Sequence, residues 1–391
     1  MSERVVIVGG AIMGSSLAWW LTELGHPPDR ITVVERDPTY AACATAFTNS
    51  CIRQQFGNPL NVAISQFGVR FLREFRERMG DDRVPPIHLH AFGYLYLAAD
   101  AAKAAQLRQA HAVQVAAGAG TRLMTPEEMA ARWPFYDLDG ILLGSHGTRD
   151  EGYFDGTTMF DWWRRIARQR GVTYLDGAVA GIDTRGGRVG GVTLADGRAL
   201  PAGIVVNAAG TRGAEVARMA GLDLPVEPRK RYTWVFDAER PLGQDLPLTI
   251  DPSGVHVRTD GALYMAGCTP ALDPAVDPDD FAGEWDLWEE HVWPIIATRV
   301  PAFERIRVKR SWVGHYDLNV LDANAIVGPH SELDGFVILN GFSGHGLQQS
   351  PAMGRGVAEW ITTGGYRTLD LSPFAPDRIL RQEPFPELAV I

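Results

Sequence analysis

Three short apolar runs mark strands that we expect to be buried. Residues 4–8 are RVVIV, residues 31–37 are ITVVERD, and residues 204–210 are IVVNAAG. Polar and apolar positions do not alternate in these runs, which is typical of parallel strands covered on both faces. The uncharged stretch 5–22 approaches the length of a membrane span, but it contains three glycines and two serines and follows acidic Glu3. We therefore expect no membrane insertion.

The first two runs flank a glycine turn and a helix. Apolar residues recur at helical spacing through SSLAWWLTELG (residues 15–25), with a glycine at the expected helix end. The order strand, glycine turn, helix, strand and acid is that of a dinucleotide-binding unit. Glu35 lies 21 residues after Gly14, the distance at which an acid binds the adenosine ribose.

The glycine turn is GGAIMG, residues 9–14. Gly9 permits the tight turn out of the strand, and Gly14 permits close packing of the helix on the sheet. The helix N-terminus then offers backbone N–H groups to a pyrophosphate. Ala11 stands where the motif has its middle glycine, and neighbouring Gly10 relieves part of that constraint. The turn does not distinguish NAD from FAD.

A second glycine turn lies near the end of the chain. Residues 335–346, GFVILNGFSGHG, are a predicted strand ending in this turn, and a helix is predicted from about Pro351 to Ile361. A helix that begins at such a turn can direct its positive end at the electron-rich part of a flavin, which a nicotinamide enzyme does not need. Residues 192–200, VTLADGRAL, indicate a hairpin with its turn at Asp196-Gly197.

Alternating patterns predict half-exposed antiparallel strands elsewhere. They lie in residues 232–237, 254–267 and 305–314. The basic run RKR at residues 229–231 is interpreted as a solvated strand end, although it could reach a substrate.

Composition narrows the function. The chain has 391 residues and a net charge of −10, the wrong sign for a protein whose main partner is nucleic acid. Its three cysteines form no CxxC pair, so neither a disulfide framework nor a structural zinc site is expected, and a cytoplasmic location fits best. His88 and His90 have no evident third ligand, so no metal is expected.

Several motifs together resemble the D-amino acid oxidase/sarcosine oxidase family of FAD-dependent oxidoreductases. They are the two glycine turns, SCIRQQFGNP (residues 50–59), VNAAG (residues 206–210) and the tail LDLSPFAPDRI. The resemblance implies a mixed α/β fold, with a Rossmann-like FAD-binding domain interleaved with a mainly antiparallel substrate domain. The FAD-binding domain would comprise residues 1–83, 146–222 and 312–372, the substrate domain residues 84–145 and 223–311, and a tail residues 373–391.

The resemblance also implies an activity. Similar enzymes transfer hydride from a carbon next to an amine nitrogen onto FAD, and water hydrolyses the imine. We expect an N-substituted or cyclic amino acid as substrate, with oxygen or another electron acceptor. The alternatives are a D-amino acid oxidase or dehydrogenase, and a flavin-binding assembly factor without amine turnover.

The same resemblance implies roles for individual residues. Arg53 would hold the substrate carboxylate, since a guanidinium matches a carboxylate bidentately. Gln348 replaces a lysine of sarcosine oxidases, Tyr264 stands where a lysine activates oxygen, and His345 is a further catalytic candidate. Gly314 replaces the cysteine that attaches FAD, so we expect noncovalent FAD. The expected cofactor-binding residues are Gly9, Gly10, Ala11, Met13, Gly14, Glu35, Arg36, Thr45, Val179, Ala209, Gly210, Gly314, Gly341, Gly344, His345, Gly346 and Leu347.

Overall fold

The first apolar run forms an inner strand of a six-stranded sheet. The computed structural model describes residues 3–387. In spatial order the sheet consists of β18 (Ile326–Pro329), β19 (Phe336–Asn340), β12 (Ile204–Asn207), β1 (Val5–Val8), β2 (Ile31–Glu35) and β8 (Thr173–Asp176). All neighbouring strands are parallel except β18, which runs antiparallel to β19. The prediction of buried parallel strands is confirmed.

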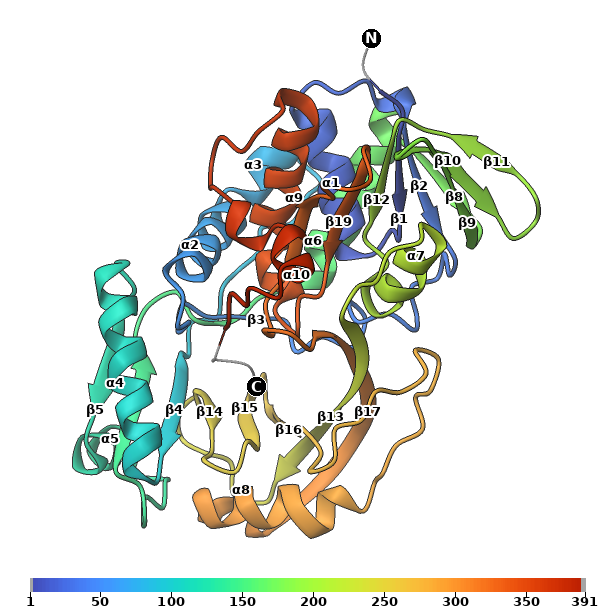
Figure 1. The fold of residues 1–391 in the computed structure, drawn as a ribbon. Helices are drawn as coiled ribbons and strands as arrows, with labels where there is room; N and C mark the ends of the chain where they lie inside the picture. The colour runs from blue at the N-terminus through green and yellow to red at the C-terminus, as the bar shows by residue number, and fades with distance from the viewer. Residues whose placement is uncertain (1–2, 388–391) are drawn as a thin grey trace.

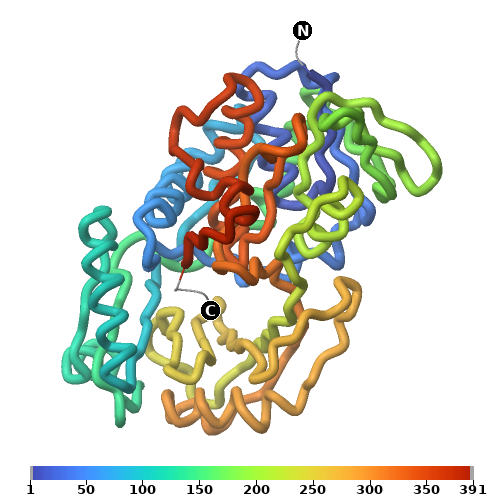
Figure 2. Tube along the Cα trace, in the orientation of Figure 1, coloured from blue at the N-terminus to red at the C-terminus, as the bar shows by residue number. Residues whose placement is uncertain are grey.

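Both faces of this sheet are covered, which explains the unbroken apolar runs. Val5 and Ile7 pack among helices, whereas Val6 and Val8 pack against a three-stranded meander and a short helix. The helices of the first face are α1 (Ile12–Glu23), α2 (Pro59–Arg73), α3 (Phe75–Met79), α6 (Gly156–Arg170) and α9 (Gly346–Thr363). The second face carries β9 (Val179–Arg185), β10 (Arg188–Leu194), β11 (Ala199–Pro201) and α7 (Gly213–Met219). Figure 2 shows the C-terminal part of the chain, in red, against the N-terminal part, and α9 packs on α1.

A second sheet of eight strands lies below the first in Figure 1. Its order is β17 (Ile306–Asn319), β13 (Val226–Ala238), β16 (Leu263–Cys268), β15 (His256–Asp260), β14 (Leu248–Ile250), β4 (Tyr94–Ala98), β6 (Leu143–Gly147) and β5 (Thr121–Met124). All pairs are antiparallel except β14 with β4. The long strands β13 and β17 of this sheet pair along their length and run from beside α7, next to the first sheet, through the second sheet (Figure 1).

Shorter elements connect and cover the two sheets. The two-residue strands β3 (Cys51–Ile52) and β7 (Gly152–Tyr153) pair with each other between the sheets. The remaining helices are α4 (Ala101–Ala116), α5 (Pro126–Arg132), α8 (Trp293–Arg299) and α10 (Asp377–Leu380). Single turns are η1 (Pro28–Arg30), η2 (Gly210–Arg212), η3 (Trp288–Val292), η4 (Pro301–Glu304) and η5 (Ser372–Phe374). No helix in residues 3–387 is long and apolar enough to cross a membrane.

The mixed α/β fold class and the hairpin at Asp196-Gly197 are confirmed. The predicted start of the last long helix at Pro351 is wrong, because α9 begins at Gly346. Pro351 lies inside the helix, and its missing N–H leaves the Leu347 carbonyl to accept the Ser350 hydroxyl instead, at 2.8 Å. The division into domains stays a prediction, and β17 crosses the proposed boundary at residue 312.

Candidate active site

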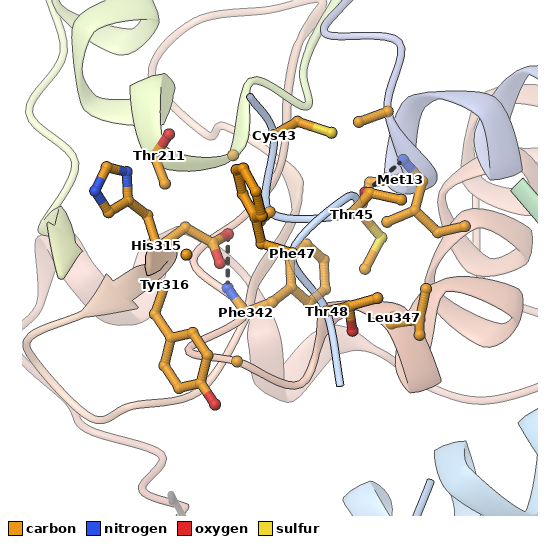
Figure 3. Close-up of a pocket in the computed structure, with 18 of the residues that line it drawn as sticks. Met13, Cys43, Thr45, Phe47, Thr48, Thr211, His315, Tyr316, Phe342 and Leu347 are labelled. Atoms are coloured by element: carbon orange, nitrogen blue, oxygen red, sulfur yellow. Dashed lines mark hydrogen bonds between the residues drawn. The ribbon is translucent and has the colours of Figure 1, made fainter. Parts of the chain in front are cut away.

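A cavity of about 720 Å³ lies between the two sheets. On one side it is lined by the segments that follow β1, β2, β12 and β19. In open α/β sheets, ligands bind outside the carboxyl ends of the strands, where these segments lie. On the other side it is lined by residues of β13, β15, β16 and β17. Figure 3 shows side chains from opposite ends of the chain, including Met13 and Leu347, around this cavity.

The first glycine turn packs as the motif requires. Gly9 has a φ of +99°, and a Cβ there would lie 2.8 Å from the carbonyl carbon of Ala208. A Cβ on Gly14 would overlap the carbonyl oxygen of Gly9. Ala11 is the N-cap of α1 and lines the cavity, as do Gly9 and Met13. Gly10 and Gly14 shape the turn from outside the cavity lining.

Glu35, at the end of β2, lines the cavity close to this turn. Its Oε2 accepts a hydrogen bond from Gly10 N at 2.8 Å, and its Oε1 accepts one from Asp37 N at 2.9 Å. Burial raises the pKa of this carboxyl. Each oxygen has a second lone pair, so both can still accept a hydrogen bond from a ribose hydroxyl.

The other predicted cofactor residues at this end also line the cavity. They are Arg36, Thr45, Val179, Ala209 and Gly210. The Thr45 hydroxyl accepts Ile12 N at 3.3 Å, which holds segment 42–49 against the start of α1 (Figure 3).

The second glycine turn forms the opposite end of the cavity. Gly341 and Gly344 have φ values of +71° and +87°. A Cβ on Gly344 would overlap the ring of Tyr316. Gly344, Gly346, Leu347 and Gly314 line the cavity, whereas Gly341 lies outside the lining. The 18-residue helix α9 starts here, so its positive end faces this space.

Asp317 adds a buried carboxyl to this wall. Its Oδ2 accepts Phe342 N at 3.0 Å, as the dashed line in Figure 3 shows. Burial raises the pKa of Asp317 to about 6. Asp317 was not predicted from the sequence, because no local pattern distinguishes it from a strand residue that faces solvent.

The structure brings Arg53, His345 and Gln348 together. Arg53 is 4% exposed, and its backbone N donates to Gln348 Oε1 at 2.9 Å. Its guanidinium Nε donates to the carbonyl of Gln55 at 3.4 Å, and a terminal nitrogen lies 2.9 Å from His345 Nε2. The guanidinium also lies 4.6 Å from the ring centroid of Phe56. These three of the four predicted catalytic residues line the cavity.

Tyr264 is not brought to the cavity. Its ring packs between Phe236 and Phe303 in the core of the second sheet, and its hydroxyl accepts Leu242 N at 2.7 Å. Cys268 on the same strand does line the cavity. The two residues are four positions apart, which corresponds to about 13 Å of strand and places Tyr264 beyond the site.

Several lining residues were not predicted from the sequence. Burial lowers the pKa of His256 to about 4, so this histidine is neutral. The interpretation of RKR as a solvated strand end is wrong for Arg231, which lines the cavity, pairs with Asp273 at 2.8 Å and lies over the Tyr316 ring at 4.6 Å. The aromatic residues Phe47, Tyr94 and Tyr232 complete this part of the lining.

The chain is similar to known proteins over nearly its whole length. Residues 4–360 match the DAO family, described as FAD dependent oxidoreductase. FAD-dependent oxidoreductase domain-containing protein 1 of Xenopus laevis is 38% identical, over 99% of this chain and 84% of the relative. Mitochondrial sarcosine dehydrogenase of Mus musculus is 26% identical over 93% of this chain, which spans 40% of that protein. The crystal structure of L-proline dehydrogenase from P. horikoshii has a TM-score of 0.85 and 26% identity, covering 98% of this chain and 99% of that one.

Proposed function

The chain belongs to the DAO family of FAD-dependent oxidoreductases, and we propose that it oxidises the C–N bond of an N-substituted or cyclic amino acid. The observation that carries the proposal is the buried guanidinium of Arg53. It lies in the cavity wall beside the start of α9, and Gln348 of that helix holds its backbone. Sarcosine dehydrogenase and L-proline dehydrogenase are named for substrates of this class.

The residues around the cavity fit FAD. Two helix N-termini, those of α1 and α9, open to the same space and suit the pyrophosphate and the electron-rich part of the flavin. Glu35 presents oxygens for the ribose, and Ala209 and Gly210 allow a close approach of the backbone. We propose that FAD is bound noncovalently, because Gly314 has no side chain to form a bond with it.

Arg53 would orient the substrate by its carboxylate. A guanidinium can donate two parallel hydrogen bonds to a carboxylate, which fixes direction as well as position. The carbonyl of Gln55 and the ring of Phe56 restrict the guanidinium from the protein side. A substrate held in this way keeps its amine and the adjacent carbon in a constant place relative to the cofactor.

The cavity would keep the amine neutral. Aromatic rings of Tyr94, Tyr232 and Tyr316 line it, and His256 carries no charge at neutral pH. Burial in such surroundings disfavours an ammonium ion, which frees the nitrogen lone pair to form the C=N bond as the C–H bond breaks. Bound FAD would supply the hydride acceptor. Addition of water to the imine would give a carbonyl compound and an amine, which remain one ring-opened molecule when the substrate is cyclic, and oxygen or another acceptor would take the electrons.

The test is the visible spectrum of the purified protein without oxygen. We expect a yellow protein that loses its flavin absorbance on addition of sarcosine, another N-methyl amino acid or proline. Bleaching by D-amino acids alone would favour the primary-amine alternative. Flavin absorbance that no amine in the panel changes would contradict the proposal and favour an assembly factor. Admitting oxygen to the reduced protein then separates an oxidase from a dehydrogenase.

A further inference from the structure

We propose that Glu151 is a positioning residue for Arg53. Its carboxylate accepts hydrogen bonds from segment 53–55 outside the cavity lining, so that the Arg53 guanidinium stays fixed in the cavity wall. The inference rests on the proposed carboxylate-binding role of Arg53, and it goes beyond that role because Glu151 itself does not line the cavity.

The contacts run in one chain from Glu151 to the guanidinium. Glu151 is 1% exposed, and its Oε1 accepts Gln54 N at 2.8 Å. Its Oε2 accepts Gln55 Nε2 at 3.0 Å. The carbonyl of Gln55 accepts Arg53 Nε at 3.4 Å, and the Gln55 amide oxygen accepts the Ser145 hydroxyl at 2.8 Å. The carboxylate therefore fixes both residues that follow Arg53.

The donors to Glu151 are neutral amides, so its charge does not serve an ordinary surface ion pair. A carboxylate removed from water is costly unless hydrogen bonds compensate for the lost hydration. The cost is visible in its pKa, which burial raises to about 7, whereas the nearby charge of Arg53 lowers it. The fold therefore maintains a buried acid next to the cation that would bind substrate.

The surrounding backbone makes room for this carboxylate. Glu151 lies in the connection between β6 and β7, next to the β7–β3 pair that leads directly to Arg53. A Cβ on Gly147 would overlap the Glu151 carboxylate. Gly152 has a φ of +149°, and a Cβ there would overlap the carbonyl of His90. Two positions without side chains thus allow the carboxylate to reach segment 53–55.

The first test is Glu151→Gln in the FAD-loaded protein. The glutamine amide has the same shape as the glutamate carboxylate. Its NH₂ group, however, faces an N–H donor of Gln54 or Gln55, at a position where a carboxylate oxygen of Glu151 accepted a hydrogen bond. We expect the Kd of a non-oxidisable carboxylate, 2-furoate, to rise about tenfold, as for the loss of one charge-assisted hydrogen bond. Binding is read from the shift in the flavin spectrum. The rate of flavin reduction at saturating substrate should stay within about threefold of the wild type, because the reacting groups are unchanged.

The matched control is Glu359→Gln. Glu359 is also 1% exposed and accepts backbone N–H groups, from Arg367 at 2.8 Å and Thr368 at 2.9 Å, but it lies outside the cavity lining. This variant should lose thermal stability and keep the wild-type Kd for 2-furoate. An equal loss of affinity in both variants would overturn the inference, because it would indicate general loosening of the fold.

A double-mutant cycle separates positioning from an independent role. In an Arg53→Lys background the bidentate contact is already lost, so Glu151→Gln should weaken 2-furoate binding by less than about twofold. The same tenfold loss in both backgrounds would contradict the inference.

A second variant, Ser145→Ala, serves if Glu151→Gln fails to fold. It removes only the hydrogen bond from the Ser145 hydroxyl to Gln55 and should raise the Kd for 2-furoate about threefold. An unchanged Kd would overturn the inference. Failure of the wild type to bind 2-furoate would instead contradict the proposed role of Arg53.

Discussion

Substitution of Gly9 by alanine should release FAD, and the structure gives the size of the effect. Gly9 has a φ of +99°, and a Cβ there would lie 2.8 Å from Ala208 C and 3.0 Å from Ala209 Cα. These are backbone atoms of the segment after β12, so they cannot rotate away as a side chain does. Overpacking of this kind costs about 1–3 kcal/mol. If the strain displaces the turn that faces FAD, the Kd should rise about 5- to 150-fold.

The matched control is Gly25→Ala. Gly25 also has a positive φ, +82°, but a Cβ there would meet no atom within 4 Å. It carries the backbone strain without the clash, so it should lower thermal stability and leave FAD affinity unchanged. In the assay, each apoprotein is titrated with FAD, and binding is monitored by the quenching of flavin fluorescence. Melting temperatures are measured in parallel. Equal FAD affinity of Gly9→Ala and wild type would refute the assignment of this turn.

Three further predictions concern charged groups. Folding raises the pKa of Asp317 to about 6. The protonated carboxyl therefore stabilises the fold fully below the pKa that Asp317 has in the unfolded chain, and this stabilisation is lost as the pH rises through 6. Between pH 4 and 8, the melting temperature of apo Asp317→Asn should therefore increase relative to that of wild type. Arg378→Met leaves the buried carboxylate of Asp322 without its 2.8 Å partner and should cost about 3–5 kcal/mol in urea unfolding, whereas the exposed Arg381→Met should cost little. Asp279→Asn removes the exposed carboxylate that pairs with Arg36 and Arg212 at the cavity. Both guanidinium groups should then attract the FAD pyrophosphate more strongly, so FAD should dissociate about twofold more slowly than from wild type in low salt, and at the same rate in 1 M salt.

The parts of the fold that depend on short-range chemistry could be predicted from the sequence. The first glycine turn needs glycine at residues 9 and 14 because backbone atoms approach there, and the hairpin at 196–197 needs a glycine with positive φ. Such requirements leave a pattern within a few residues. The resemblance to a known family added Arg53 and Gln348, which lie 295 residues apart and have no local signal of their own.

The rest of the site depends on pairing between distant strands. Tyr94, His256 and Arg231 reach the cavity because of the order of strands in the second sheet, which no short pattern specifies. Tyr264 was misplaced for the same reason, since its distance from the site depends on how far β16 extends. Glu151 could not be found either, because its partners Gln54 and Gln55 are about 97 residues away in the chain.

The most direct test of the central claim compares proline with pyrrolidine, which has the same ring and nitrogen but no carboxylate. The rate of flavin reduction per unit concentration is measured without oxygen for wild type and Arg53→Met. We expect wild type to prefer proline on the order of 100-fold, as for a charged, bidentate contact, and Arg53→Met to lose this preference while it retains FAD. If sarcosine proves the better substrate, dimethylamine serves as its partner. A preference for the carboxylate that persists unchanged in Arg53→Met would contradict the proposed role of Arg53.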